Sequence, residues 1–124
     1  MIKVKHVMDA READDGDRLW VEPIGLTKDL AEWCNVDHIL PHLGPPVKLW
    51  EWFDEHADGY EFFRGCYHDS LTRGPYMVAL QQLACVGARE NFTLLHAGDD
   101  PSHNCAVALY EFLSALEAYC PPES

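Results

Sequence analysis

The side chains best suited to chemistry gather in one short segment of this sequence, LLHAGDDPSHNCAVAL at residues 94–109. His103 is a candidate general base, because an unperturbed imidazole titrates close to neutral pH. The alternative is that His103 donates a hydrogen bond to a nearby carbonyl and only orders the loop. We interpret Asn104 as a residue that orders the loop by hydrogen bonding rather than as a catalytic group.

Carboxylates near this pair could form a cation site. Asp99 and Asp100 precede the pair directly, and Asp9 and Glu22 follow two other predicted strands. Oxygen ligands of this kind suit hard cations. The interpretation that we favour is simpler: Asp100 caps a helix, and Asp99 is solvated. We therefore assign no metal ligands.

A thiol lies beside the imidazole, since Cys105 follows His103 by two residues. Positions two apart on a helix point about 200° apart, so these side chains cannot exchange a proton directly. We place Cys105 past the first helical turn, where the helix dipole no longer activates a thiol. We expect buried core cysteines at Cys66, Cys85 and Cys105. Five cysteines without a CxxC pair predict reduced thiols.

These residues stand where a predicted strand ends and a predicted helix begins. The apolar run at 92–96 is typical of a strand, and apolar residues then recur at helical spacing from 106 to 116. Asp100 followed by Pro101 predicts the N-cap and the first residue of that helix. In this register Asn104 points toward solvent.

The rest of the chain predicts a small sheet with helices around it. Alternation at residues 2–8 and the run at 18–22 indicate strands, and the segment 35–46 reads as a loop. Gly87 is the expected C-cap of its helix. The expected helices are 27–33, 47–53, 59–71 and a segment from Pro75 to Gly87.

The order of elements predicts one α/β domain over residues 1–120, with a mostly parallel three- or four-stranded sheet flanked by helices. Residues 121–124 are expected to form a flexible tail. We expect the strands 2–8 and 92–96 to be neighbours. Ligands of such sheets bind beyond the carboxyl ends of the strands, so the junction after residue 96 is the expected place for a site.

The charge balance bears on partners. The chain has 21 acidic residues against 9 Lys and Arg, a net charge of −12. We expect no nucleic-acid binding, because phosphate contacts need cations, and no attraction to anionic membranes. The start of the sequence has no apolar segment typical of a signal peptide, and no run approaches the length of a transmembrane helix. We therefore expect a cytoplasmic, acidic protein.

Four stretches also carry a family resemblance. They are the opening MIKVKHVMD, the turn DDG followed by Arg18, the aromatic and Arg positions between 52 and 67, and TLLHAGDDPSHNCAVAL near the end. Together they resemble the YeaO-like family of small bacterial proteins, a domain of unknown function (family 488). The last stretch is the most specific. The resemblance implies a fold and the location of a site, but no reaction.

Two positions depart from the family pattern. Family members carry D-R-L-W-P-R-G after the second strand, whereas this chain has EPIG at 22–25, shorter and without either arginine. Asp99 stands where the family has an Arg before the last helix. The resemblance thus implies that this chain has lost Arg side chains that would favour the binding of an anion. We expect the site to reject phosphate and to accept a cation or a neutral polar ligand.

These observations predict a small binding domain with its site at the carboxyl edge of the sheet. A hydrolase- or lyase-like enzyme using His103 as general base is one alternative, and an acidic module that meets a basic protein partner is another. The sequence names no cofactor and no oligomeric state. The expected site residues are Asp9, Arg18, Glu22, Asp99, Asp100, His103 and Asn104.

Overall fold

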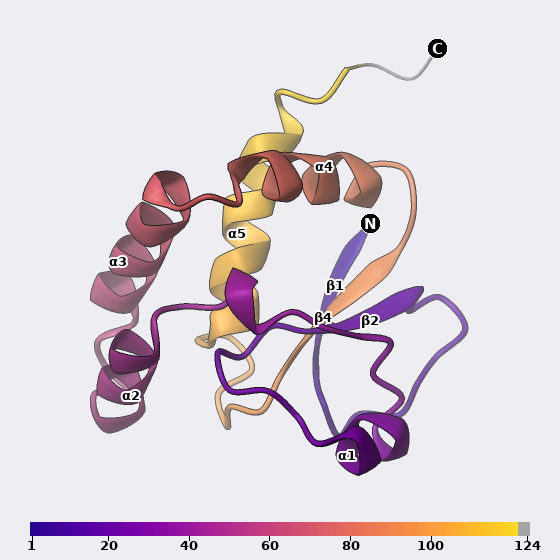
Figure 1. The fold of residues 1–124 in the computed structure, drawn as a ribbon, viewed down its shortest axis with the longest axis horizontal. Helices are drawn as coiled ribbons and strands as arrows, with labels where there is room; N and C mark the ends of the chain where they lie inside the picture. Colours follow the sequence, from indigo (N-terminus) through magenta and orange to yellow (C-terminus); the bar gives the residue numbers. More distant parts are fainter. Residues whose placement is uncertain (122–124) are drawn as a thin grey trace.

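Four short strands pair into one sheet in the order β1-β4-β2-β3, and every pair is parallel (Figure 1). This computed structural model describes residues 1–121, so residues 122–124 of the predicted tail lie outside it. The pairing confirms the predicted α/β fold and the predicted contact between the first and last strands. The strands are β1 (Ile2–His6), β2 (Asp17–Trp20), β3 (His38–Ile39) and β4 (Phe92–His96).

The helices fall where their periodicity places them, with one addition among the connections. The segment 35–46, predicted as a loop, contains the two-residue strand β3 and a short 3-10 helix. The sequence carries no strand pattern there, and β3 forms because the free edge of β2 supplies its partner. The elements are α1 (Lys28–Trp33), η1 (Pro41–Leu43), α2 (Val47–Glu55), α3 (Tyr60–Arg73), α4 (Met77–Gly87) and α5 (Cys105–Glu117).

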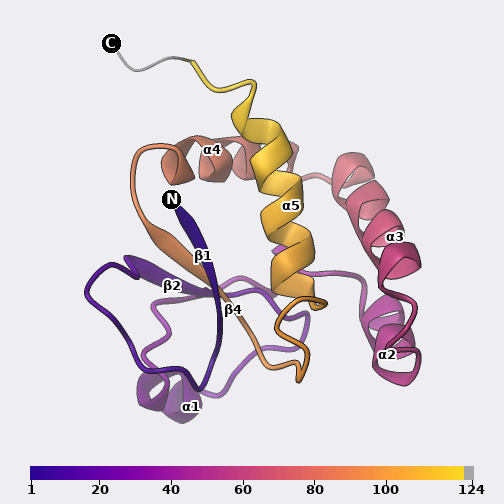
Figure 2. The same ribbon diagram turned by 180° about the vertical axis from the view of Figure 1, so that it is seen from behind.

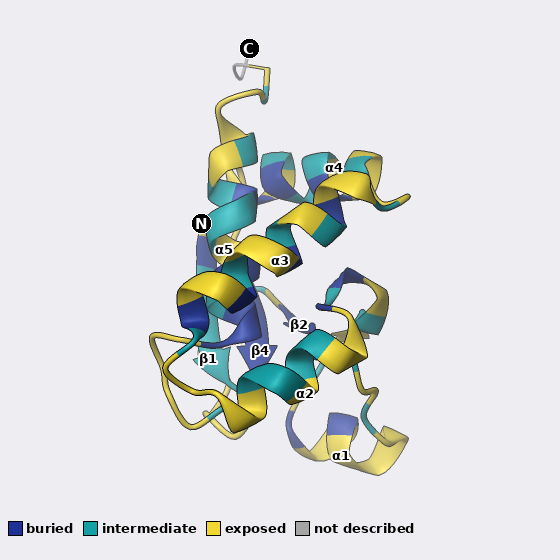
Figure 3. Ribbon diagram, turned by 90° about the vertical axis from the view of Figure 1, so that its left-hand side faces the viewer, coloured by how far each residue is buried: buried dark blue, intermediate teal, exposed yellow. Residues whose placement is uncertain are grey.

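The central strand β4 is buried on both faces, as a continuous apolar run in a parallel sheet should be. Leu94 packs into the main core, which is completed by α3, α4 and α5. Leu95 packs with Trp20 in a smaller cluster on the face that α1 covers. Figure 2 shows α1 apart from the other helices, and Figure 3 shows β4 as buried and most of β1 as only partly buried. Both faces of the sheet therefore fix the position of the end of β4.

Gly87 is not the C-cap that the sequence suggests. It is the last residue of α4, and Ala88 follows as the cap in a right-handed helical conformation. A Cβ at Gly87 would lie 2.6 Å from the side chain of Ile2. The glycine is therefore needed for the close approach of α4 to β1 and not for a left-handed turn.

The cysteines also differ from the prediction. Cys85 of α4 forms a disulfide with Cys120, with 5.5 Å between their Cα atoms. The turn after α5 brings the two residues together although they are 35 positions apart in the sequence. Cys66 is exposed rather than buried, whereas Cys105 is buried as expected. No helix in residues 1–121 is both long and apolar enough to cross a bilayer.

These differences lead to a labelling pattern that can be tested. In the folded, unreduced protein we expect Cys66 to react quickly with a thiol reagent, because it is exposed. Cys34 and Cys105 should react only when the protein unfolds. Cys85 and Cys120 should react only when the protein is unfolded and their disulfide is reduced. Mass spectrometry of peptides after timed alkylation measures this order. Rapid alkylation of Cys105 in the native protein would contradict the buried position of its thiol.

Candidate functional site

The junction between β4 and α5 is built differently from the prediction. Asn104, not Asp100, is the N-cap of α5: its Oδ1 accepts the N–H of Val107 at 2.9 Å. The Nδ2 of Asn104 donates to the carbonyl of Asp100 at 2.9 Å, so this side chain is buried and not solvated. Asp100 instead accepts the N–H of Ser102 at 2.8 Å and closes a turn before the helix.

We expect this difference to appear in stability measurements. Asn104→Ala should cost about 0.5–2 kcal/mol, the usual range for the loss of an N-cap. Asp100→Ala should cost less, because its acceptor serves one exposed turn. Urea denaturation of both variants measures the difference. If Asp100→Ala were less stable than Asn104→Ala, the N-cap of α5 would be Asp100 and not Asn104.

Cys105 is the first residue of α5, so it does not lie past the first turn as predicted. Its thiol is nevertheless not activated. Burial raises the pKa of Cys105 well above its ordinary value, and the nearby charge of Glu22 raises it further. A protonated thiol is a poor nucleophile. The geometry therefore gives no support to a thiol-based reaction.

A cavity of about 250 Å³ opens at the carboxyl edge of the sheet, between the ends of β2 and β4, the start of α5 and one side of α2. It collects most of the predicted site. It also has an aromatic and acidic wall from α2, formed by Trp50, Phe53 and Asp54, which the sequence did not indicate. The predicted residues that line it are Glu22, Asp99, Asp100, His103 and Asn104.

Glu22 organises the inner wall of this cavity. Its carboxylate is almost fully buried and accepts two hydrogen bonds. Oε1 accepts the N–H of Ala97 at 3.0 Å, and Oε2 accepts the indole Nε1–H of Trp50. The carboxylate thus connects the ends of β2 and β4 with α2. Trp50 lies 28 residues from its partner, and no local pattern reveals such a pair.

The outer wall is formed by the loop after β4. The Nδ1 of His103 lies 3.2 Å from Oδ2 of Asp100, and its ring stacks on Tyr60 with 4.6 Å between centroids. The N–H of Ser102 and the charge of His103 hold the pKa of Asp100 below its ordinary value. No Lys or Arg from residues 1–121 lines the cavity, which is therefore negative.

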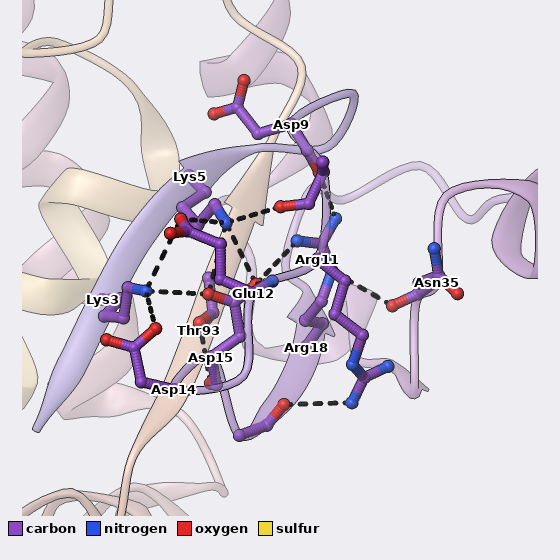
Figure 4. Close-up of polar contacts among 12 residues, drawn as sticks. Lys3, Lys5, Asp9, Arg11, Glu12, Asp14, Asp15, Arg18, Asn35 and Thr93 are labelled. Carbon is purple, nitrogen blue, oxygen red and sulfur yellow. Dashed lines mark hydrogen bonds and ion pairs between the residues drawn. The ribbon is translucent and has the colours of Figure 1, made fainter.

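Arg18 lies apart from this cavity. It is fully buried, and its guanidinium pairs with Asp15 at 2.9 Å (Figure 4). Every nitrogen of the guanidinium has a partner, so Arg18 ties the chain together and offers nothing to a ligand in this conformation. Its remaining acceptors are the carbonyls of Val7, Asp9, Cys34 and Asn35.

Asp15, the partner of Arg18, is also fully buried. Burial alone would raise its pKa, but hydrogen bonds from Lys3, Arg18 and Lys5 outweigh burial and hold the pKa well below its ordinary value. Asp9 lies at the end of β1, outside the cavity, and its Oδ2 accepts the N–H of His6 at 3.1 Å. The structure therefore brings five of the seven predicted residues together and places Asp9 and Arg18 elsewhere.

In the part of the chain that the structure describes, no group of three or more His, Cys, Asp or Glu side chains is arranged to hold a metal ion.

A family model described as the inactive DUF488-N3 subclade matches residues 1–119. No curated protein and no solved structure shows significant similarity to the chain.

Proposed function

This chain belongs to the DUF488 family and to its inactive N3 subclade, and from that premise we propose that it binds a small ligand without transforming it. The proposed site is the cavity at the carboxyl edge of the sheet, where ligands of parallel α/β folds usually bind. The observation that carries the proposal is the composition of the cavity wall. Acidic side chains from three separate parts of the chain meet an aromatic surface there.

The charge of this wall determines which ligands it accepts. A carboxylate about 4 Å from an anion repels it by roughly 4 kcal/mol at an effective dielectric near 20, before solvent screening. The N-terminus of α5 attracts the anion by only about 0.3–1 kcal/mol. Repulsion therefore prevails, since Glu22, Asp54, Asp99 and Asp100 all line the cavity. We infer a ligand that is cationic, or neutral with hydrogen-bond donors.

The aromatic part of the wall favours an organic ligand. The indole of Trp50 is held in place by its bond to Glu22, and Phe53 lies in the same wall. A cation over the face of a Trp ring gains about 0.5–2 kcal/mol. A small molecule with an ammonium group and an apolar body would use both the carboxylates and the rings.

Three benzene derivatives of nearly equal shape and different charge, with inorganic phosphate as a fourth ligand, test this proposal. We would titrate the protein at neutral pH by calorimetry with benzylamine, benzyl alcohol, benzoate and inorganic phosphate. Benzylamine should bind more tightly than benzyl alcohol, and both more tightly than benzoate. A charge effect of about 1.4 kcal/mol corresponds to a tenfold difference in the dissociation constant. Phosphate should not bind. The proposal would be refuted if benzoate or phosphate bound more tightly than benzylamine, or if none of the four compounds bound.

Matched variants locate the binding. Asp99→Asn and Asp54→Asn should each weaken the binding of benzylamine and reduce the difference between its affinity and that of benzoate. Asp29→Asn removes the same charge from an exposed residue of α1, a helix that does not line the cavity, and should leave the preference intact. An equal effect of all three changes would mean that net charge, and not the cavity, produces the preference.

An enzymatic role for His103 is the weaker candidate. The Asp100–His103 pair does orient the imidazole in the manner of a general base. The adjacent thiol of Cys105, however, is kept protonated by burial and by Glu22. The subclade to which the chain belongs is also described as inactive. Both points favour binding over turnover.

A further inference from the structure

Two histidines end the neighbouring strands β1 and β4 in the same way. His6 and His96 are paired in the sheet register. The Nδ1 of His6 accepts the N–H of Met8 at 3.1 Å, and the Nδ1 of His96 accepts the N–H of Gly98 at 3.1 Å. The two rings meet edge to face, with 5.4 Å between centroids. Each imidazole therefore closes the turn that follows its own strand.

This arrangement determines where a proton can go. A ring whose Nδ1 accepts an N–H carries its own proton on Nε2. Protonation of the ring adds a second proton at Nδ1, which would then face the N–H of residue 98 in the case of His96. Two donors cannot share that hydrogen bond, and an unmade bond at a buried group costs free energy. Protonated His96 is thus incompatible with the closed turn.

The turn closed by His96 is part of the cavity wall. Ala97, the first residue after β4, donates its N–H to Glu22. A Cβ placed on Gly98 would lie 3.7 Å from Nδ1 of His96 and 3.5 Å from Cβ of Asn104. Gly98 therefore lies close to both the imidazole and the N-cap residue of α5. Asp99 follows directly and lines the cavity.

We propose that His96 is a proton-sensitive latch: its protonation releases the turn at Gly98 and opens the cavity wall, so that acid regulates the site. The consequence for binding rests on the proposed function, whereas the opening of the turn does not. The latch needs only the paired geometry of Nδ1 and the N–H of residue 98.

The groups around His96 determine the direction of the response. Burial and the neighbouring His6 lower the pKa of His96, whereas Asp9, in the turn after β1, and a backbone hydrogen bond of Gly98 oppose them; burial and His6 prevail. Glu22, after β2, reaches the same loop through Ala97, and the first turn of α5 carries no acidic residue. The unfolded chain, with an ordinary pKa of 6.5, therefore takes up this proton before the native protein does. Stability should fall as the pH drops below that value.

Nuclear magnetic resonance of the ligand-free protein tests the latch. Imidazole ¹⁵N shifts at neutral pH should show the proton of His96 on Nε2. As the pH is lowered below 6.5, the hydrogen-exchange protection factor of Gly98 should fall by up to about tenfold per pH unit, until His96 is protonated in the closed protein as well, because one proton is linked to opening. A His96 that carries its proton on Nδ1, or a Gly98 whose protection is constant while His96 titrates, would overturn the proposal.

Two conservative variants sharpen this test. In His96→Asn the side-chain oxygen can accept the same N–H two residues on but does not titrate. Protection of Gly98 should then be independent of pH, and a persisting response would overturn the proposal. In His6→Asn the response should persist with a higher midpoint, because a neighbour that lowers the pKa of His96 is gone. No ligand is present, so the latch and the benzylamine proposal can fail separately.

Discussion

Arg18→Met should destabilise the protein by about 3–5 kcal/mol, the range found when one partner of a buried ion pair is removed. Arg18 and Asp15 are both fully buried. The substitution would leave the carboxylate of Asp15 with Lys3, Lys5 and the backbone N–H of Glu12 as its partners. It would also remove the donor from the four backbone carbonyls that Arg18 joins. Methionine fills much of the volume, so the loss measures the polar network rather than a cavity.

Chemical denaturation at neutral pH measures this loss, and Arg11→Met provides the matched control. Arg11 pairs with Asp37 at 3.0 Å near the surface, where such pairs are worth about 0.2–1 kcal/mol. Because the pKa of Asp15 lies below its ordinary value of 3.8, the network contributes fully above that pH and is lost as the pH falls further. Equal stability losses in the two variants would contradict the account of Arg18 as a structural residue.

Glu22→Gln should cost about 1–3 kcal/mol although the side chains have the same shape, because a buried donor loses its acceptor. Both carboxylate oxygens of Glu22 accept N–H donors, one from Ala97 and one from Trp50. An amide has a single acceptor oxygen, so its NH₂ group must face one of these donors. The pKa of Cys105 should also move toward its ordinary value, because the charge of Glu22 raises it.

Denaturation and the pH dependence of thiolate absorbance check both effects of Glu22→Gln. Asp54→Asn makes the corresponding carboxylate-to-amide change at an exposed residue of the same cavity and should leave stability nearly unchanged. A Glu22→Gln variant as stable as the wild type would mean that the two hydrogen bonds do not hold the cavity wall together.

The strands and helices of this fold could be predicted where one local pattern dominates. The apolar run at residues 92–96 and the helical spacing after residue 105 were sufficient. The helix start was not, because Asp100 followed by Pro101 carries a strong local signal. Asn104 is the N-cap instead, and its side chain also donates a hydrogen bond back to the carbonyl of Asp100, a contact that a sequence pattern cannot show.

The candidate site was predicted in part for a similar reason. Residues that follow β2 and β4 meet at one edge of any parallel sheet, so Glu22 and Asp99 could be placed together. Arg18 lies near the beginning of β2, a strand length from that edge, and its pairing with Asp15 depends on the turn between them. Trp50 reaches the cavity only through the packing of α2. The disulfide of Cys85 likewise depends on tertiary contacts.

The central claim is that the cavity beside Glu22 accepts a cationic or neutral organic ligand and repels anions. The indole Nε1–H of Trp50, assigned by its loss in Trp50→Phe, is the most direct reporter, because it is bonded to Glu22 in the cavity wall. In a proton–nitrogen correlation spectrum at neutral pH, added benzylamine should shift this signal in a saturable manner, and phosphate should leave it unmoved. A signal that responds to phosphate, or that ignores benzylamine, would contradict the claim.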